Sequence, residues 1–262
     1  MKLQKELRLL VLVLLIALSQ NAFAQAKYDK PVFVLVHGAW HGGWCWQEVS
    51  QRLTAQGYKV YTPTLSGLGE HKNTLNESVG LDTHISDIIN LLTMEDLHNV
   101  VLVGHSYAGA VIEGVADSIP GRLRSLIFLD AIIAENGQSL HELQPAEMQA
   151  SEQRNIDAKQ PLAPFPVQIF GVTDPVKAAW VTARLTDQPF LTFAQQIKLH
   201  HALGNGLPRT YIACTNPQLP IMARMSEKAK SLGWQHVDMN TGHDAMITDP
   251  AGLSKLLSKL AQ

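Results

Sequence analysis

The chain has 262 residues, of which 46% are hydrophobic and 17% charged, a composition typical of a globular protein with one large domain. Its 21 basic and 23 acidic side chains nearly balance, giving a formal net charge of −2. No basic cluster indicates a nucleic-acid partner and no acidic tail indicates a solvating segment, so both classes are excluded.

The first 24 residues differ from the rest and have the layout of a secretory signal peptide. Three basic residues precede the apolar run Leu9–Leu18, and Ala22-Phe23-Ala24 provides a small-x-small cleavage site. The alternative is a membrane anchor, but ten apolar residues fall short of the roughly 20 needed to span a bilayer. We therefore expect export to the periplasm or the medium, with no stable membrane anchor in the mature protein.

From Pro31 onward, short apolar runs alternate with helical periodicity, the pattern of βαβ units around a parallel sheet. In chain order we expect strand Val32–Val36, helix Trp46–Gln56, strand Lys59–Thr64, helix Asp82–Leu92, strand Val100–Val103, helix Ala108–Ala116 and strand Leu126–Leu129. After an interruption follow strand Arg209–Cys214, helix Ile221–Leu232, strand His236–Met239 and helix Ala251–Leu260. We predict one α/β domain over residues 25–262, with a mostly parallel central sheet flanked by helices.

The interruption covers residues 132–206 approximately. It holds six prolines with polar helical stretches between them and no strand of the first kind. This pattern predicts a helical insertion that caps the sheet and roofs a cleft, and not a second domain. Its aromatics suit an apolar group of a substrate, but for any one of them packing of the insertion onto the sheet is the favoured role: Phe165, Phe170, Trp180, Phe190 and Phe193.

The chain contains two cysteines, Cys45 and Cys214. Export would allow their oxidation. They fall on separate predicted elements, which favours two buried free thiols over a disulfide.

The strongest chemical signal is Gly104-His105-Ser106-Tyr107-Ala108, where a buried strand runs into a helix with Ser106 at the junction. Such a tight turn strains the serine and leaves little room beside it, so small residues are needed two positions away on either side. Gly104 and Ala108 meet that need. The pattern predicts that Ser106 is a nucleophile with an exposed hydroxyl.

A second signal is the turn His37-Gly38-Ala39-Trp40-His41-Gly42-Gly43 after the first strand. Acyl transfer builds negative charge on a carbonyl oxygen, which backbone amides in a preorganised turn stabilise. We assign the amides of Ala39 and Tyr107 as oxyanion donors, and Trp40 and Tyr107 as substrate-binding residues beside them. A plain tight turn with buried aromatics is the alternative. We expect His37 and His41 to be structural.

The third signal is Thr241-Gly242-His243-Asp244 after the last strand. A serine hydroxyl needs an adjacent base, most often histidine. His243 follows Ser106 in the chain at the carboxyl end of the final strand, where this fold places its base. His105 is the main rival, but its side chain should point away from the cleft.

Together the segments from Val36 to Trp46, Gly104 to Ser106 and Gly242 to His243 resemble the α/β-hydrolase branch that holds plant methylesterases and hydroxynitrile lyases. Bacterial esterases, including pyrethroid-hydrolase-like proteins, belong to the same branch. The resemblance covers nearly all of the chain after the leader and is weakest in the insertion. It implies a serine hydrolase with a helical cap, no metal, no cofactor and a small-molecule ester as partner.

The acid that orients His243 departs from the plant pattern. In the plant relatives it follows the strand that corresponds to Arg209–Cys214, where this chain has Thr215-Asn216-Pro217 and no carboxylate. Orienting His243 and stabilising its imidazolium nevertheless requires a buried negative group beside it. Asp130 lies at the end of an earlier strand, as in certain haloalkane dehalogenases, and preserves the order Ser, acid, His. We assign Asp130, while Asn216 or Asp238 remains the alternative.

Two other functions compete with ester hydrolysis. Hydroxynitrile lyases of this branch carry Lys after the catalytic His, Thr in the oxyanion turn and Glu before the serine, where this chain has Asp244, Gly38 and His105. All three departures favour an esterase. A non-catalytic ligand receptor on the same fold is the other class, and covalent labelling by a fluorophosphonate would separate it from the enzyme.

Overall fold

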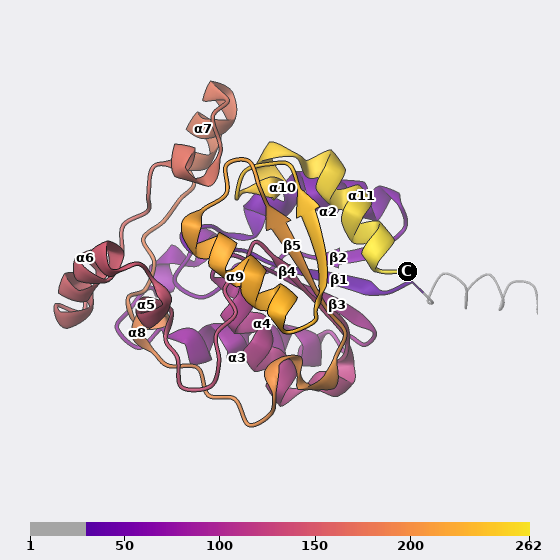
Figure 1. Ribbon diagram of the computed structural model, residues 1–262, viewed down its shortest axis with the longest axis horizontal. Coiled ribbons are helices and arrows are strands. Elements are labelled where there is room, and N and C mark those ends of the chain that lie inside the picture. Colours follow the sequence, from indigo (N-terminus) through magenta and orange to yellow (C-terminus); the bar gives the residue numbers. More distant parts are fainter. Residues whose placement is uncertain (1–29) are drawn as a thin grey trace, which may run out of the picture.

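The computed structural model describes residues 30–262, so the predicted signal peptide lies outside the described part of the chain. Six parallel strands form one sheet in the order β2-β1-β3-β4-β5-β6 (Figure 1). The strands are β1 (Val32–Val36), β2 (Lys59–Tyr61), β3 (Val100–His105), β4 (Leu123–Leu129), β5 (Arg209–Cys214) and β6 (Gln235–Met239). All strands being parallel, their carboxyl ends meet at one edge, where loops from distant parts of the sequence converge.

Helices cover both faces of this sheet, because the central strands are apolar on both sides (Figure 1). One face packs against α2 (Gln47–Ala55) and α11 (Pro250–Leu260). The other packs against α3 (Leu81–Met94), α4 (Ala108–Ser118) and α9 (Pro220–Ser231). Shorter helices are η1 (Gly43–Trp46), η2 (Gly69–Thr74), η3 (Pro120–Arg122), η5 (Leu203–Gly206) and α10 (Ala245–Thr248).

Between β4 and β5 the chain leaves the sheet, and we call residues 132–206 the cap segment. It contains α5 (Leu140–Leu143), α6 (Ala146–Asp157), η4 (Val167–Phe170), α7 (Pro175–Thr182) and α8 (Leu191–Ala194). Figure 1 shows α5 to α8 standing to one side of the sheet. The predicted α/β architecture with a helical insertion is confirmed.

Every predicted strand and helix is present, with ends that differ by a few residues. The two largest differences are three residues each: β4 begins at Leu123 where the pattern predicted Leu126, and β2 stops at Tyr61 where it predicted Thr64. Pro63 explains the early end of β2, since proline has no N–H to donate to the neighbouring strand. β2 is an edge strand with β1 as its one neighbour, so its early end leaves no strand unpaired on the outer side.

Both cysteines are buried free thiols in the structure. Burial raises the pKa of the Cys45 thiol well above its ordinary value, and the same cause raises that of Cys214. Within residues 30–262, no helix is both long and apolar enough to cross a membrane.

Glu113 on α4 is a buried acid, with 1% of its surface exposed. Its Oε2 accepts a hydrogen bond from the Gly204 amide at 2.8 Å, and burial raises its pKa from 4.5 to about 7. The native state therefore binds a proton more tightly than the unfolded chain. The stability contributed by this proton is fully present below pH 4.5 and is lost as the pH rises to about 7.

Replacing Glu113 with glutamine is expected to raise the thermal unfolding midpoint near pH 8 but not near pH 4.5, because glutamine stays neutral. At about 1.4 kcal/mol for each pKa unit, the difference is about 3 kcal/mol. Thermal unfolding of both proteins at the two pH values measures it. An equal change in midpoint at both values would contradict the raised pKa.

Candidate active site

Ser106 stands at a strained turn between β3 and α4. Its φ is 54°, in the left-handed region that L-residues avoid. A Cβ at Gly104 would lie 2.6 Å from the Ala108 carbonyl oxygen, so only glycine fits there. The Ser106 amide donates to Leu129 O at 3.2 Å, and its carbonyl accepts from Ile132 N at 3.0 Å. Backbone bonds to both ends of the serine thus hold the strained conformation that lifts its hydroxyl into the cavity.

His243 and Asp130 complete a hydrogen-bonded line with Ser106. His243 Nε2 lies 2.9 Å from Ser106 Oγ, and His243 Nδ1 lies 2.7 Å from Asp130 Oδ2. The other oxygen of Asp130 accepts a hydrogen bond from the Cys214 amide at 3.1 Å. Because a carboxylate only accepts, His243 Nδ1 must donate, which leaves Nε2 free to accept the serine proton.

The alternative acids lie elsewhere. Asp238 is two-thirds exposed and faces His236 Nδ1 at 3.7 Å. Asn216 is exposed, whereas the His243 ring is buried. The carboxylate that the structure places against His243 is therefore the one at the end of β4, and Asp130 is also fully buried.

The turn after β1 passes directly over the serine. A side chain at Gly38 would meet Ser106 Cβ at 3.0 Å and His105 Nδ1 at 2.8 Å, which leaves no room for the threonine of the lyases. Ala39 and Trp40 follow and line the same cavity as Ser106. The predicted oxyanion residues, Ala39 and Tyr107, thus lie on the two segments that flank the serine.

Trp40 is held by the cap segment through three bonds. Its amide donates to Gln188 Oε1 at 2.9 Å, its carbonyl accepts from Thr186 N at 3.0 Å, and its indole Nε1 donates to Leu162 O at 2.9 Å. These bonds hold Trp40 at a φ of 65°, which a bulky residue rarely adopts. Leu162 and Gln188 in turn pair with each other as an antiparallel bridge.

A cavity of about 250 Å³ opens onto Ser106 and His243 between the sheet and the cap segment. Its wall is almost entirely apolar, and among the described residues that line it none is a Lys, Arg, Asp or Glu. Besides Ser106 and His243, the lining residues are Ala39, Trp40, Tyr107, Ile132, Leu140, Gln144, Pro145, Met148, Phe165, Ile169, Phe170, Phe193, Leu219, Pro220, Ile221 and Met222.

Some aromatics of the cap segment line the cavity, and others pack outside it. Phe165, Phe170 and Phe193 line the cavity, each with its ring centroid within 6.0 Å of Trp40. Phe190 is buried outside it. Sequence reasoning missed the wall that the start of α9 supplies, Leu219 to Met222, because its apolar spacing indicates only core packing.

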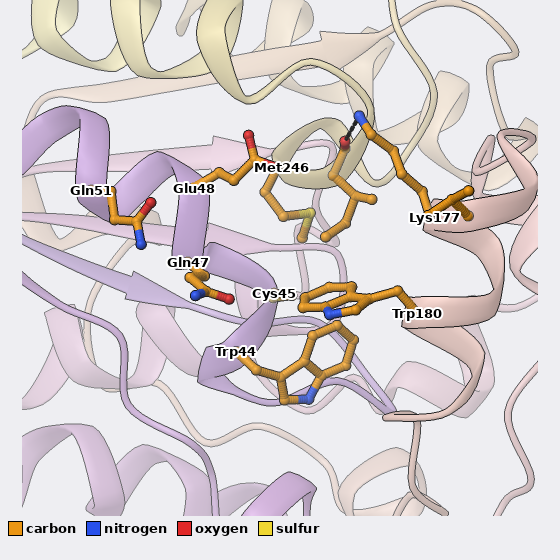
Figure 2. Close-up of a pocket in the computed structure, with 10 residues that line it drawn as sticks. Trp44, Cys45, Gln47, Glu48, Gln51, Lys177, Trp180 and Met246 are labelled. Carbon is orange, nitrogen blue, oxygen red and sulfur yellow. Dashed lines mark hydrogen bonds between the residues drawn. The ribbon is translucent and has the colours of Figure 1, made fainter.

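Trp180 lies in a second hollow of about 320 Å³ that shares no lining residue with the first. Figure 2 shows its indole beside that of Trp44, edge to face at 5.2 Å between ring centroids. In the same hollow Lys177 Nζ donates to Ile247 O at 2.8 Å, which ties α7 to α10 (Figure 2). The Trp44–Trp180 contact and the Lys177–Ile247 bond fasten the cap segment to the core at this hollow.

Two buried histidines, His37 and His84, each accept a hydrogen bond at one ring nitrogen and are therefore neutral. His37 donates from Nδ1 to Gly38 O and accepts at Nε2 from the Leu65 amide, and burial lowers its pKa to about 3. His84 donates to Ser66 O and accepts from the Tyr107 hydroxyl, and burial lowers its pKa to about 4. The structural role expected for His37 agrees with these contacts.

His105 lies behind the active site, as its predicted orientation requires. It does not line the cavity, and its Nε2 donates to the carbonyl of His243 at 3.0 Å. In the described part of the chain, His105, His243 and Asp244 form the one group close enough to hold a metal ion. Both ring nitrogens of His243 already face Ser106 and Asp130, so the set serves hydrogen bonding and we assign no metal to it.

A serine on a strand-to-helix elbow, a histidine after the last strand and a carboxylate at an inner strand end define the class of α/β-hydrolases. The chain belongs to the Alpha/beta hydrolase family, whose model matches residues 33–256. The resemblance proposed from the sequence is confirmed.

Relatives within that family are bacterial and plant proteins. The chain is 35% identical over 244 residues to the carbendazim hydrolyzing esterase of Nocardioides sp. (strain SG-4G), covering 87% of this chain and 98% of that protein. It is 32% identical over 111 residues to methylesterase 7 of Arabidopsis thaliana, covering 42% of this chain and 43% of that protein.

Among solved structures, an extracellular α/β-hydrolase from a Paenibacillus species is similar, with a TM-score of 0.77 at 24% identity. That match covers 87% of this chain and 98% of the other. A pyrethroid hydrolase from Sphingobium faniae matches with a TM-score of 0.68 at 21% identity, over 88% of this chain and 97% of the other. At these identities the likeness supports the fold.

Proposed function

We propose that the protein is a serine hydrolase that cleaves carboxylic esters through an acyl-enzyme on Ser106. The observation that carries this proposal is the line of two short hydrogen bonds from Ser106 Oγ through His243 to Asp130, at the floor of an apolar cavity. Family membership and esterase relatives support the same reaction.

Each group has a role in the proposed mechanism. His243 Nε2 takes the proton of Ser106 as the hydroxyl attacks the ester carbonyl, and Asp130 stabilises the imidazolium that forms. The amides of Ala39 and Tyr107 donate to the oxyanion. His243 then protonates the leaving alkoxide, and water releases the acyl group by the same steps in reverse.

The substrate class follows from the cavity wall. An ionised group entering this cavity would lose its hydration with no opposite charge to replace it, which costs several kcal/mol. We therefore propose uncharged esters whose acyl or alcohol part is apolar and of medium size. Trp40 and Tyr107 form the part of the wall nearest the proposed oxyanion donors.

A panel of p-nitrophenyl esters tests this proposal. We expect kcat/KM to rise from acetate to a medium-chain ester, since each added methylene buries apolar surface. The p-nitrophenyl monoester of succinic acid, which is anionic, is expected to be hydrolysed at least about tenfold more slowly than the butyrate of equal chain length. Equal rates for these two esters would place the acyl group outside the cavity.

Carbendazim, on which the Nocardioides relative acts, is a further candidate substrate for the same panel.

We also propose that the protein is exported and that residues 1–24 are removed, on the evidence of the basic, apolar and small-residue pattern of that segment.

A further inference from the structure

Behind the proposed catalytic groups lies a buried pair that joins two loops from opposite ends of the sequence. His41 belongs to the turn that carries Ala39, and Asp244 directly follows His243. His41 Nε2 lies 3.2 Å from Asp244 Oδ2, and the two residues are 2% and 0% exposed. The separation of 203 residues means that the pair forms only in the folded chain.

The contacts of His41 define its charge. Its Nδ1 faces the Ala39 carbonyl at 2.8 Å, while Nε2 faces the Asp244 carboxylate. Both partners can only accept, so the ring donates from both nitrogens and is an imidazolium. His37 in the same turn differs, since its Nε2 accepts from an amide and the ring stays neutral.

The direction of the pKa shifts agrees with an ion pair. Burial alone would lower the pKa of His41, but the charge of Asp244 and the hydrogen bond to it outweigh burial and raise that pKa. Burial alone would raise the pKa of Asp244, but the His41 charge and hydrogen bond outweigh it and lower that pKa.

The pair connects the groups that the reaction needs. On one side His41 holds the carbonyl of Ala39, whose amide is a proposed oxyanion donor. On the other side the Asp244 amide donates to Phe170 O at 3.0 Å, and Phe170 lines the cavity. Asp244 also lies one bond from the backbone of His243, so its anchorage fixes where the imidazole stands.

We propose that His41 and Asp244 are positioning residues: their buried ion pair locks the oxyanion turn to the His243 loop, so that base and oxyanion donors keep one geometry. This inference rests on the proposed esterase function for its kinetic readout. The pair also sets the local charge, because a carboxylate beside His243 is neutralised by His41 only while the pair is intact.

Other groups that face His243 are accounted for. Asp130 contacts its Nδ1 and Ser106 its Nε2, while the neutral His105 packs with its ring centroid 4.6 Å away and donates to its carbonyl. The Cys214 thiol, which burial keeps protonated, lies 3.9 Å from the same carbonyl. The charged groups near His243 are therefore Asp130 and the His41–Asp244 pair, whereas Ser106, His105 and Cys214 are neutral.

The test is a double-mutant cycle of His41→Gln and Asp244→Asn, measured as kcat and KM on p-nitrophenyl butyrate across pH. Each single variant is expected to lose at least about tenfold in kcat with little change in KM, since misplacement affects the transition state more than binding. The double variant restores an uncharged amide-to-amide bond, so we expect it to be more active than the product of the two single losses predicts.

The pH profile separates positioning from general destabilisation. His41→Gln leaves the Asp244 carboxylate unneutralised beside His243, which favours the imidazolium of the base. We expect its acid limb of kcat/KM to move up by about one pH unit, and the limb of the double variant to return toward that of the unaltered protein.

His141→Gln is the matched control. His141 also pairs with a carboxylate, Glu152, at 3.0 Å, but this pair lies in the cap segment and does not line the cavity. We expect its kcat and acid limb to match those of the unaltered protein. If both single variants match it as well, or if their losses simply multiply in the double variant, the positioning role is overturned.

Nitrogen-15 spectra of the histidine rings test the pair without any turnover. At about pH 8, where an ordinary histidine is neutral, His41 is expected to show two protonated nitrogens in the unaltered protein and one in Asp244→Asn. Asp244→Asn leaves two neutral partners and so is the variant most compatible with folding. A neutral His41 in the unaltered protein overturns the inference, whether or not any ester is hydrolysed. Absence of hydrolysis and of fluorophosphonate labelling, with His41 charged, would instead overturn the proposed function alone.

Discussion

Substituting Ser106 with alanine is expected to abolish ester hydrolysis while leaving the fold unchanged. The change removes the oxygen that lies 2.9 Å from His243 Nε2 and no backbone contact of the elbow. Removing the nucleophile of a comparable serine hydrolase lowers kcat on the order of 10⁶-fold. Turnover of p-nitrophenyl butyrate measures the loss, and intact mass after fluorophosphonate treatment is expected to show one adduct on the unaltered protein and none on the variant.

Ser226→Ala is the control for this experiment. Ser226 on α9 is buried, whereas Ser106 is half-buried, and its hydroxyl bonds His236 Nε2 at 2.8 Å, away from the lining of the cavity. We expect this variant to keep its turnover and its single adduct. A Ser106→Ala protein that retained turnover within about tenfold of the control would require a different nucleophile.

Asparagine in place of Asp130 is expected to lower kcat by about 10⁴-fold with the geometry of the site intact. One oxygen of Asp130 accepts from the Cys214 amide and the other from His243 Nδ1. Asparagine has a single oxygen, which satisfies the Cys214 amide, and its NH₂ group then faces His243. The imidazole must accept there and protonate Nε2 instead, so it can no longer take the proton of Ser106.

Asp238→Asn provides the comparison, because sequence reasoning left Asp238 open as the acid. Its carboxylate is exposed and faces His236. We expect its kcat to match that of the unaltered protein. Near-normal kcat in Asp130→Asn together with a large loss in Asp238→Asn would reverse the assignment. Thermal unfolding of both variants separates a loss of chemistry from a loss of structure.

Local signals in the sequence were enough to predict the fold and the position of the serine. The elbow at Ser106 depends on small residues within two positions of it, and the strand-helix alternation depends on periodicity within short windows. The acid was harder to predict because its partner lies 113 residues away. Only the meeting of β4 with the last strands at one edge brings Asp130 to His243.

The remaining parts of the site have no local signature. His41 and Asp244 are ordinary loop residues until the two ends of the chain come together, and the pattern around His41 predicted only a structural role. The start of α9, including Met222, packs into the core and also forms a wall of the cavity. One apolar face serves both purposes, so its periodicity cannot distinguish them.

The three bonds from Trp40 to the cap segment bear on how such an enzyme can be shortened or recombined. A core trimmed of residues 132–206 would keep Asp130 but lose the partners of the Trp40 amide, carbonyl and indole, and with them the support for a strained turn. Exchanging this insertion for that of another hydrolase would therefore change the scaffold of the reaction as well as the shape of its entrance. Grafts that aim at new specificity should carry over Leu162, Thr186 and Gln188 as a unit.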